Sequence, residues 1–249
     1  MTIRPIAFTG AMVSALLDGR KTQTRRVLSI PFLEGINPQH TGLVATRSYG
    51  STWQVYGTAD ASKPFDVRYE VGDLLYVREC WRTPESLDHL SPRQIAERCD
   101  ELGYRGRWCP RVTEADDMTH QWSEEDGFRD DEPTGRLRAA MHMPRWASRL
   151  TLKVTDVRVE RVKQISEADA KAEGVRVLPL QRVDDPSAWW EVEPGQHQAR
   201  NPRGAFRSLW DSINSPRGFG WDANPWVCCI EFSVHRGNVA DLIKSGVLS

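Results

Sequence analysis

The sequence predicts an α+β protein in which short strands outnumber helices. Runs of β-branched and aromatic residues bounded by Gly, Pro or Asp recur along the chain, whereas few segments have the 3.6-residue apolar period of a helix. The chain has 249 residues, of which 39% are apolar and 27% charged, and its mean hydropathy is -0.54. This size and composition are typical of a globular protein with a sizeable core and exclude a chain that is disordered throughout.

Five segments are predicted to form strands because apolar and β-branched residues concentrate between turn residues: Arg4–Phe8, Thr22–Leu28, Trp53–Gly57, Asp73–Cys80 and Trp226–His235. A sixth segment, Leu150–Val162, alternates apolar and polar residues but changes phase at Asp156. This change predicts either one long strand with a bulge or two short strands joined by a turn. Residues 31–52 contain Gly, Asn and Pro with little periodicity and are predicted to be a loop.

Three helices are predicted from their caps and their apolar faces. Gly10–Asp18 is a short helix that Gly19 ends, and Ser166–Glu173 begins with a serine N-cap and ends at Gly174. Pro202–Asn214 is an amphipathic helix whose apolar stripe consists of Phe206, Leu209, Trp210 and Ile213. The last fourteen residues are predicted to add a short helical tail.

We expect one domain over residues 1–249 that carries two insertions. The first insertion, at about 85–135, has no clean strand period and holds nine acidic residues against one arginine between Glu114 and Glu132. It is most simply an addition to a smaller β-rich domain. The second insertion, at about 177–203, separates the Ser166–Glu173 helix from the Pro202–Asn214 helix.

The sequence predicts a cytoplasmic protein without a metal or a cofactor. No apolar run approaches the roughly 20 residues that a membrane-spanning helix needs, and the first residues lack the pattern of a signal peptide. The five cysteines are therefore expected to be free thiols. Cys99, Cys109 and His120 are conceivable metal ligands, but they lack the spacing of a zinc site.

Charge is strongly segregated along the chain, although the net charge is only -1. Residues 1–30 carry +4, residues 85–135 carry -8 and residues 136–182 carry +6. A basic surface is compatible with nucleic-acid binding, because phosphate neutralisation by Lys and Arg supplies most of the non-specific affinity. On charge alone, two solvated faces of opposite sign are the favoured interpretation.

The most specific string is GRKTQTRR, which runs from Gly19 to Arg26 directly after the first predicted helix. Taken alone, it is a helix C-cap with basic residues at the negative end of the helix dipole. Its context is more informative. The string is followed by a Val-Gly-Asp strand start at 71–73, by the 150–162 strand segment, by ISEADAKAEGV and by a terminal strand that contains IEF.

This order resembles the ASCH domain, a PUA-like β-barrel family associated with RNA and modified nucleotides, whose signature is G-x-K-x-x-E/T-x-R. The chain matches the threonine form at Gly19, Lys21, Thr24 and Arg26. It is most similar to the bacterial amidohydrolases that remove the acetyl group from 4-acetylcytidine, and by its size it also resembles larger ASCH-like proteins of tailed phages and prophages. The resemblance implies a PUA-like barrel with short flanking helices, and a functional set that falls on Lys21, Thr24 and Glu173.

Removal of an acyl group from an exocyclic amine needs a nucleophile, a base, a donor to the oxyanion and an acid for the leaving amine. Thr24 is a weak nucleophile without a base beside it, and Lys21 is a base only when its pKa falls below the usual 10.4 or so. Residues three apart in a regular strand point to opposite faces, so the turn before Thr24 must be irregular. Glu173 is placed to orient a water or to protonate the amine; without the resemblance it is a solvated helix-end residue.

Ten tryptophans are unusual for this length, and aromatic side chains beside Arg form the surfaces on which bases stack. Large aromatic residues are nevertheless more often part of a core. The candidate substrate-binding residues are Arg20, Arg26, Arg78, Trp81, Arg145 and Trp146.

Three functions are compatible with these residues. The first is an amidohydrolase that acts on a 4-acylcytidine-type base, nucleoside or nucleic acid. The second is a non-catalytic PUA-like protein that binds RNA or a modified base, and the third is an ASCH-type ribonuclease. The expected partner is a modified nucleoside or a nucleic acid rather than a membrane. The acidic 85–135 insertion is expected to mimic nucleic acid, to cover the pocket or to bind a protein.

Overall fold

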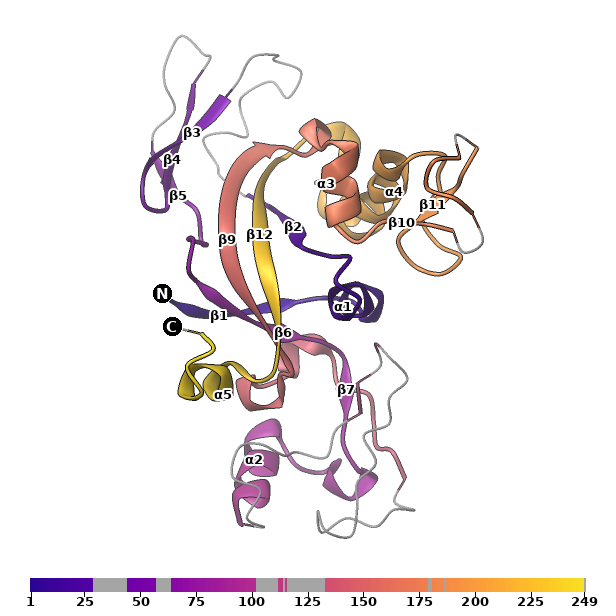
Figure 1. Ribbon diagram of the computed structural model, residues 1–249. Coiled ribbons are helices and arrows are strands. Elements are labelled where there is room, and N and C mark those ends of the chain that lie inside the picture. The colour runs from indigo at the N-terminus through magenta and orange to yellow at the C-terminus, as the bar shows by residue number, and fades with distance from the viewer. Residues whose placement is uncertain are drawn as a thin grey trace. The chain divides into compact units, whose positions relative to one another are not determined.

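The computed structural model describes residues 1–28, 44–56, 64–101, 112–113, 115, 133–178, 181–185 and 187–248. It confirms a mixed α+β architecture with several sheets and few helices (Figure 1). The chain folds as two compact units. Unit 1 comprises Met1, Asp18–Asp73 and Val154–Ser233, and unit 2 comprises Thr2–Leu17, Leu74–Lys153 and Val234–Ser249.

The largest sheet has five strands in the order β1-β6-β9-β12-β2. Their bounds are β1 Ile3–Ala7, β6 Leu74–Arg78, β9 Leu150–Arg161, β12 Trp226–Arg236 and β2 Gln23–Val27. β1 pairs with β6 in parallel, whereas β6 with β9 and β12 with β2 pair antiparallel. The two long strands β9 and β12 run side by side and contribute residues to both units (Figure 1). No closed barrel is found among the strands of the described part of the chain.

β9 is one continuous strand, which decides between the two predictions made for this segment. Its buried apolar residues are Leu150, Leu152 and Val154 before the phase change, and Val157 and Val159 after it. The change of phase near Asp156 therefore moves the apolar side chains to the other face without a turn.

The prediction of a loop over residues 31–52 is wrong at its C-terminal end. β3 (Val44–Tyr49) pairs antiparallel with β4 (Thr52–Tyr56), which in turn pairs with β5 (Phe65–Asp66). Gly50, with φ of 52°, adopts the left-handed conformation that lets β3 turn back into β4. Residues 31–43 lie outside the described residues.

Two capped helices of unit 1 confirm the sequence prediction. α3 (Glu167–Ala172) is capped by Ser166, whose hydroxyl accepts a hydrogen bond from the Asp169 backbone while the Asp169 carboxylate accepts one from the Ser166 backbone. α4 (Pro202–Asn214) is capped by Asn201 and buries most of its apolar stripe. The two helices contact each other, and α4 also contacts β11 (Trp190–Glu191), the antiparallel partner of β10 (Arg176–Val177).

Unit 2 contains α1 (Gly10–Leu17), α2 (Pro92–Glu101) and the C-terminal α5 (Val239–Lys244), which confirms the predicted helical tail. Its second sheet pairs β7 (Trp81–Arg82) with β8 (Val112–Thr113). The described residues of 85–135 contribute no strand to the five-stranded sheet, as predicted. A core cluster under α2 consists of Trp81, Leu87, Ile95, Met143 and Ala147.

None of the helices in the described ranges is long and apolar enough to cross a membrane.

Candidate functional site

The GRKTQTRR string forms an irregular turn that leads into β2. Gly19 has φ of 72°, in the left-handed region that favours glycine. Lys21 forms an isolated antiparallel bridge with Glu173, and the regular pairing of β2 with β12 begins only at Gln23. The irregular turn that the sequence predicts is confirmed.

Lys21 and Glu173 contact each other directly, although 152 positions separate them in the sequence. The Lys21 Nζ donates to Glu173 Oε2 at 2.8 Å and to the Glu173 carbonyl oxygen at 2.8 Å. A backbone hydrogen bond of 2.9 Å from Thr22 to the Ala172 carbonyl runs beside them. Lys21 is 0% exposed and Glu173 is 4% exposed, so the pair is shielded from water. Side-chain and backbone hydrogen bonds therefore hold the end of α3 against the turn before β2.

Arg25 completes the charge balance around Glu173. Its Nη1 lies 3.1 Å from Glu173 Oε1, so each oxygen of this carboxylate contacts one cation. The other Arg25 nitrogens contact Glu160 Oε1 at 2.6 Å and Asp169 Oδ2 at 3.4 Å. Arg25 belongs to the site, and it was not predicted as a site residue. A signal for it was present, because positions 23 and 25 share one face of the predicted strand.

Gln23 and Arg158 extend this polar cluster, and neither was predicted. Gln23 is 2% exposed, and its Oε1 accepts a hydrogen bond of 3.2 Å from Arg158 Nη2. The same guanidinium contacts Asp169 at 3.2 Å and also pairs with Glu231. Charged residues at alternate positions of β9, Asp156, Arg158 and Glu160, were the sequence signal for a polar cluster on this strand.

The electrostatic environment of Lys21 suits a base. Burial lowers the pKa of Lys21, the adjacent Glu173 carboxylate opposes this shift, and the positive charges of Arg26 and Arg25 reinforce it. Because both carboxylate oxygens already contact cations, Glu173 is shared between Lys21 and Arg25 rather than committed to Lys21. The net direction is a lysine that is easier to deprotonate than a solvated one.

Thr24 lies on β2 opposite Ile230 and is 3% exposed. Strand alternation places it on the other face from Gln23 and Arg25. Within the described residues, no hydrogen bond joins the Thr24 hydroxyl to Lys21 or Glu173. The structure thus brings Lys21 and Glu173 into contact and places Thr24 on β2, three residues after Lys21.

Arg20 and Arg26 flank the Lys21–Glu173 pair. Arg20 is half-buried; its Nη1 donates to the Gly174 carbonyl at 2.8 Å and its Nη2 pairs with Asp18 at 2.9 Å. Burial lowers the pKa of Arg26, and the surrounding charges of Tyr69 and Glu173 oppose this shift. Both arginines belong to unit 1, as do Lys21, Thr24 and Glu173.

The other predicted binding residues belong to unit 2. Arg78 is half-buried, lies over the Tyr76 ring at 5.3 Å and donates to the Tyr76 hydroxyl and to the Met141 carbonyl. Trp81 is 0% exposed and packs in the core, with the Arg138 guanidinium 5.5 Å from its ring centroid. Trp81 therefore has no free face on which a base can stack, because the core cluster covers it.

Trp146 and Arg145 lie at the edge of the same core. Trp146 is half-buried and packs edge-to-face on Trp81, with 6.0 Å between the ring centroids. Arg145 is exposed, and its carbonyl oxygen accepts a hydrogen bond from Asn238. Arg145 is the more exposed of the two residues.

Among the described residues, no group of three or more His, Cys, Asp and Glu side chains is placed to hold a metal ion. Cys109, His120 and the side chain of Cys99 lie outside the described residues. Cys228 and Cys229 are buried free thiols, and burial raises the pKa of Cys228 to about 12. A thiol with this pKa is not a nucleophile at neutral pH.

Comparison of the chain with protein families, with curated proteins and with solved structures gives no match.

Proposed function

We propose that the protein is an amidohydrolase that removes an acyl group from the exocyclic amine of a modified cytosine. Its working residues are Lys21, Thr24 and Glu173. The proposal includes the PUA-like barrel of the ASCH domain as the architecture, which rests on the resemblance of the GRKTQTRR string and of the strand and helix order. The substrate is a 4-acylcytidine-type base, free or within a nucleic acid.

One observation carries the proposal. The resemblance requires that Lys21 and Glu173 meet, and they do so at 2.8 Å across 152 positions of sequence. Lys21 is 0% exposed at this place, and its amine contacts both the carboxylate and the carbonyl oxygen of Glu173. A buried lysine that has a lowered pKa and contacts a carboxylate is typical of a site that transfers protons.

Lys21 acts as the general base. Because no hydrogen bond joins the two side chains, the Lys21 amine, in its neutral form, takes the proton of the Thr24 hydroxyl through one bridging water as the Thr24 oxygen adds to the acyl carbonyl carbon. The Glu173 carboxylate stabilises the resulting ammonium, and Arg25 limits that stabilisation by sharing the carboxylate. Two neighbours thus act on the pKa of Lys21 in opposite directions: Glu173 raises it and Arg25 lowers it.

The remaining steps follow from the balance of atoms. Lys21 returns its proton to the amine nitrogen as the carbon–nitrogen bond breaks, which releases cytosine and leaves the acyl group on Thr24. Water then adds to this ester and releases the carboxylic acid, again with Lys21 as the base. In this scheme Arg20 and Arg26 bind the acyl oxygen or the base and neutralise the developing negative charge.

A second function, non-catalytic recognition of a modified base, is favoured by a specific feature of Glu173. Both of its oxygens are already ion-paired, with Lys21 at 2.8 Å and with Arg25 at 3.1 Å. A carboxylate in this state suits the positioning of a lysine that donates hydrogen bonds to a ligand. The two functions differ in turnover and not in the residues that they use.

The test measures turnover and affinity on the same preparations. Purified protein is incubated with 4-acetylcytidine, cytidine is followed by chromatography, and binding is measured by calorimetry. Lys21→Met removes the amine but keeps an unbranched side chain, and Lys244→Met makes the same change at an exposed lysine of α5. The hydrolase predicts turnover by wild type and by Lys244→Met, and its loss in Lys21→Met.

The outcomes separate the two functions. Wild-type protein that binds 4-acetylcytidine without releasing cytidine excludes the hydrolase and supports recognition. In that case Lys21→Met weakens binding by about 1–3 kcal/mol, the value of a hydrogen bond from a charged donor. Wild-type protein that neither binds nor hydrolyses it excludes this ligand class.

A further inference from the structure

Arg161, at the end of β9 in unit 1, is a buried cation that the proposed chemistry does not use. It is 8% exposed, and among the residues that the structure describes no carboxylate forms an ion pair with it. Burial lowers the pKa of Arg161, and within the described chain no neighbouring charge opposes this shift. Because a buried charge without a compensating partner is costly, its position points to a ligand of opposite charge.

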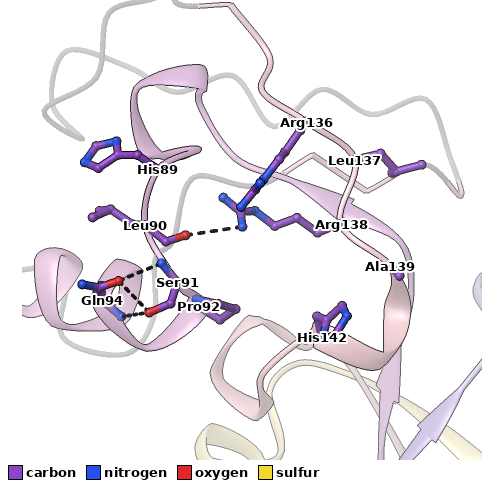
Figure 2. A pocket seen from close by; sticks show the side chains of 10 residues that line it. All are labelled: His89, Leu90, Ser91, Pro92, Gln94, Arg136, Leu137, Arg138, Ala139 and His142. Atoms are coloured by element: carbon purple, nitrogen blue, oxygen red, sulfur yellow. Dashed lines mark hydrogen bonds between the residues drawn. The ribbon is translucent and has the colours of Figure 1, made fainter.

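The other buried arginines of the described chain have carboxylate partners. Arg25 contacts several carboxylates. Arg138, one of the residues that line a pocket of about 590 Å³ in unit 2 (Figure 2), lies 3.5 Å from a carboxylate oxygen of Asp88. Arg161 differs from both in its lack of such a partner within the described residues.

The Arg161 guanidinium is held in a fixed position. Its Nη1 donates to the Asn224 carbonyl at 3.0 Å, and its Cζ lies 4.4 Å from the centroid of the Trp226 ring. The Val162 backbone donates to the Pro225 carbonyl at 3.0 Å, which joins the residue after β9 to the residue before β12. A carbonyl oxygen and an aromatic ring orient a guanidinium but do not neutralise its charge.

This stacked pair contains two unused hydrogen-bond donors. In the described part of the chain, Arg161 Nη2 and Trp226 Nε1 are both shielded from solvent and form no hydrogen bond. Neither side chain can accept a hydrogen bond through these groups, so only a ligand with acceptor oxygens satisfies them. A buried donor without an acceptor is destabilising, and two of them in one pair indicate that such a ligand binds here.

The pair lies on the same face of the five-stranded sheet as Thr24. Side chains at alternate positions of β12 share a face, which places Trp226 and Ile230 together. Ile230 lies directly opposite Thr24 on β2, and residues opposite each other in an antiparallel pair also share a face. Trp226 and Ile230 are about 13 Å apart along the strand, from the usual rise of a β-strand. The unused donors and the hydroxyl of the proposed reaction therefore face the same side of the sheet.

We propose that Arg161 and Trp226 bind the phosphate group of a nucleotide whose base lies at Thr24. A phosphate supplies the charge opposite to that of Arg161, and its oxygens accept hydrogen bonds from both the guanidinium and the indole N–H. The phosphate and the exocyclic amine lie at opposite ends of a cytidine nucleotide, so one ligand extends along this face from Trp226 to Thr24. The ligand is therefore a cytidine nucleotide, which binds more tightly than the nucleoside.

The place of the base rests on the proposed function, whereas the phosphate site rests on Arg161 and Trp226 alone. Binding of a phosphate is measured without turnover, so the two can fail separately. A preference for phosphate without hydrolysis leaves the site standing and removes the hydrolase, and hydrolysis without this preference does the reverse. The phosphate has two sources, a free nucleotide or a strand of nucleic acid, which share the chemistry of a phosphate ester.

The test is calorimetry on the full chain with three probes: 5′-CMP, cytidine and a single strand of about ten cytidylates. We expect wild type to bind 5′-CMP at least about tenfold more tightly than cytidine, the gain that a charge-assisted hydrogen bond gives. Arg161→Gln removes the charge and should abolish this preference. Trp226→Phe keeps an aromatic ring but removes the N–H, and it should reduce the preference by about threefold or more. Because the Trp226 N–H has no partner in the described structure, Trp226→Phe breaks no hydrogen bond there and decides the test if Arg161→Gln fails to fold.

Arg182→Gln is the matched control, because it removes an arginine charge from the same unit at an exposed position paired with Asp184. It should leave the preference for 5′-CMP unchanged. A strand that binds more tightly than 5′-CMP and is weakened by Arg161→Gln assigns the phosphate to nucleic acid, and equal or weaker binding of the strand assigns it to a free nucleotide. The proposal is overturned if wild type binds 5′-CMP no more tightly than cytidine, or if folded Arg161→Gln or Trp226→Phe keeps the full preference.

Discussion

Replacement of Glu173 by Gln removes the carboxylate that Lys21 and Arg25 share. Unit charges 2.8 Å apart attract each other by about 6 kcal/mol at an effective dielectric constant of about 20, and the cost of burying them offsets part of this attraction. The Glu173 side chain is 5% exposed, so solvent does not screen the loss. Removal of one partner of a buried pair costs about 3–5 kcal/mol, and we expect Glu173→Gln to lower the free energy of unfolding by that amount.

Denaturant unfolding followed by circular dichroism measures this loss. Glu167→Gln is the control, because Glu167 is exposed on the same helix and its removal costs less than about 1 kcal/mol. The double variant Lys21→Met/Glu173→Gln should lose less than the sum of the two single variants, since the lysine no longer lies unpaired. A loss below about 1 kcal/mol in Glu173→Gln, or strict additivity with Lys21→Met, would refute a buried and coupled pair.

Three further predictions concern the pKa of Lys21, the reactivity of Cys228 and the N-cap of α3. The pKa of Lys21 is lowered, so the folded chain binds fewer protons than the unfolded chain at pH values between that lowered pKa and 10.5. The free energy of unfolding of wild type should therefore rise with pH across this interval relative to that of Lys21→Met. Parallel pH profiles of the two proteins would contradict this prediction. Burial raises the pKa of Cys228 to about 12, so peptide mapping should find it unmodified by iodoacetamide at neutral pH in the folded protein and modified in denaturant. Ser166→Ala removes the cap whose hydroxyl accepts from the Asp169 backbone at 3.0 Å and should cost about 1 kcal/mol in denaturant unfolding; an unchanged midpoint would argue against this cap.

Much of the fold is predictable because local signals decide it. Ser166 caps α3 and Asn201 caps α4, and both helices occupy the predicted residues within one position. β9 is recognisable from its alternation, but its continuity through the phase change at Asp156 depends on pairing with strands far away in sequence. β4 was predicted, but its partner β3 was missed, because the polar residues Thr46, Arg47 and Ser48 leave little apolar periodicity in that strand.

The site is predictable only in part, because its residues come from distant segments. Lys21 and Glu173 were linked by resemblance and not by any local pattern. Arg25 escaped notice because an arginine in a basic string is usually solvated, whereas here Glu160 and Glu173 draw it into the interior. Trp81 is the opposite case. Nearby arginines favoured a surface on which a base stacks, but the ring is buried against Ile95 and Met143.

We propose above that Thr24 and Lys21 together remove an acyl group from the exocyclic amine of cytosine. The most direct measurement is the release of cytidine from 4-acetylcytidine by wild type, Thr24→Val and Thr22→Val, assayed side by side. Thr22 is exposed two residues before Thr24, so Thr22→Val makes the same chemical change outside the buried cluster. We expect wild type and Thr22→Val to release cytidine and Thr24→Val to release none. Equal release by Thr24→Val and wild type, or no release by wild type, would contradict it.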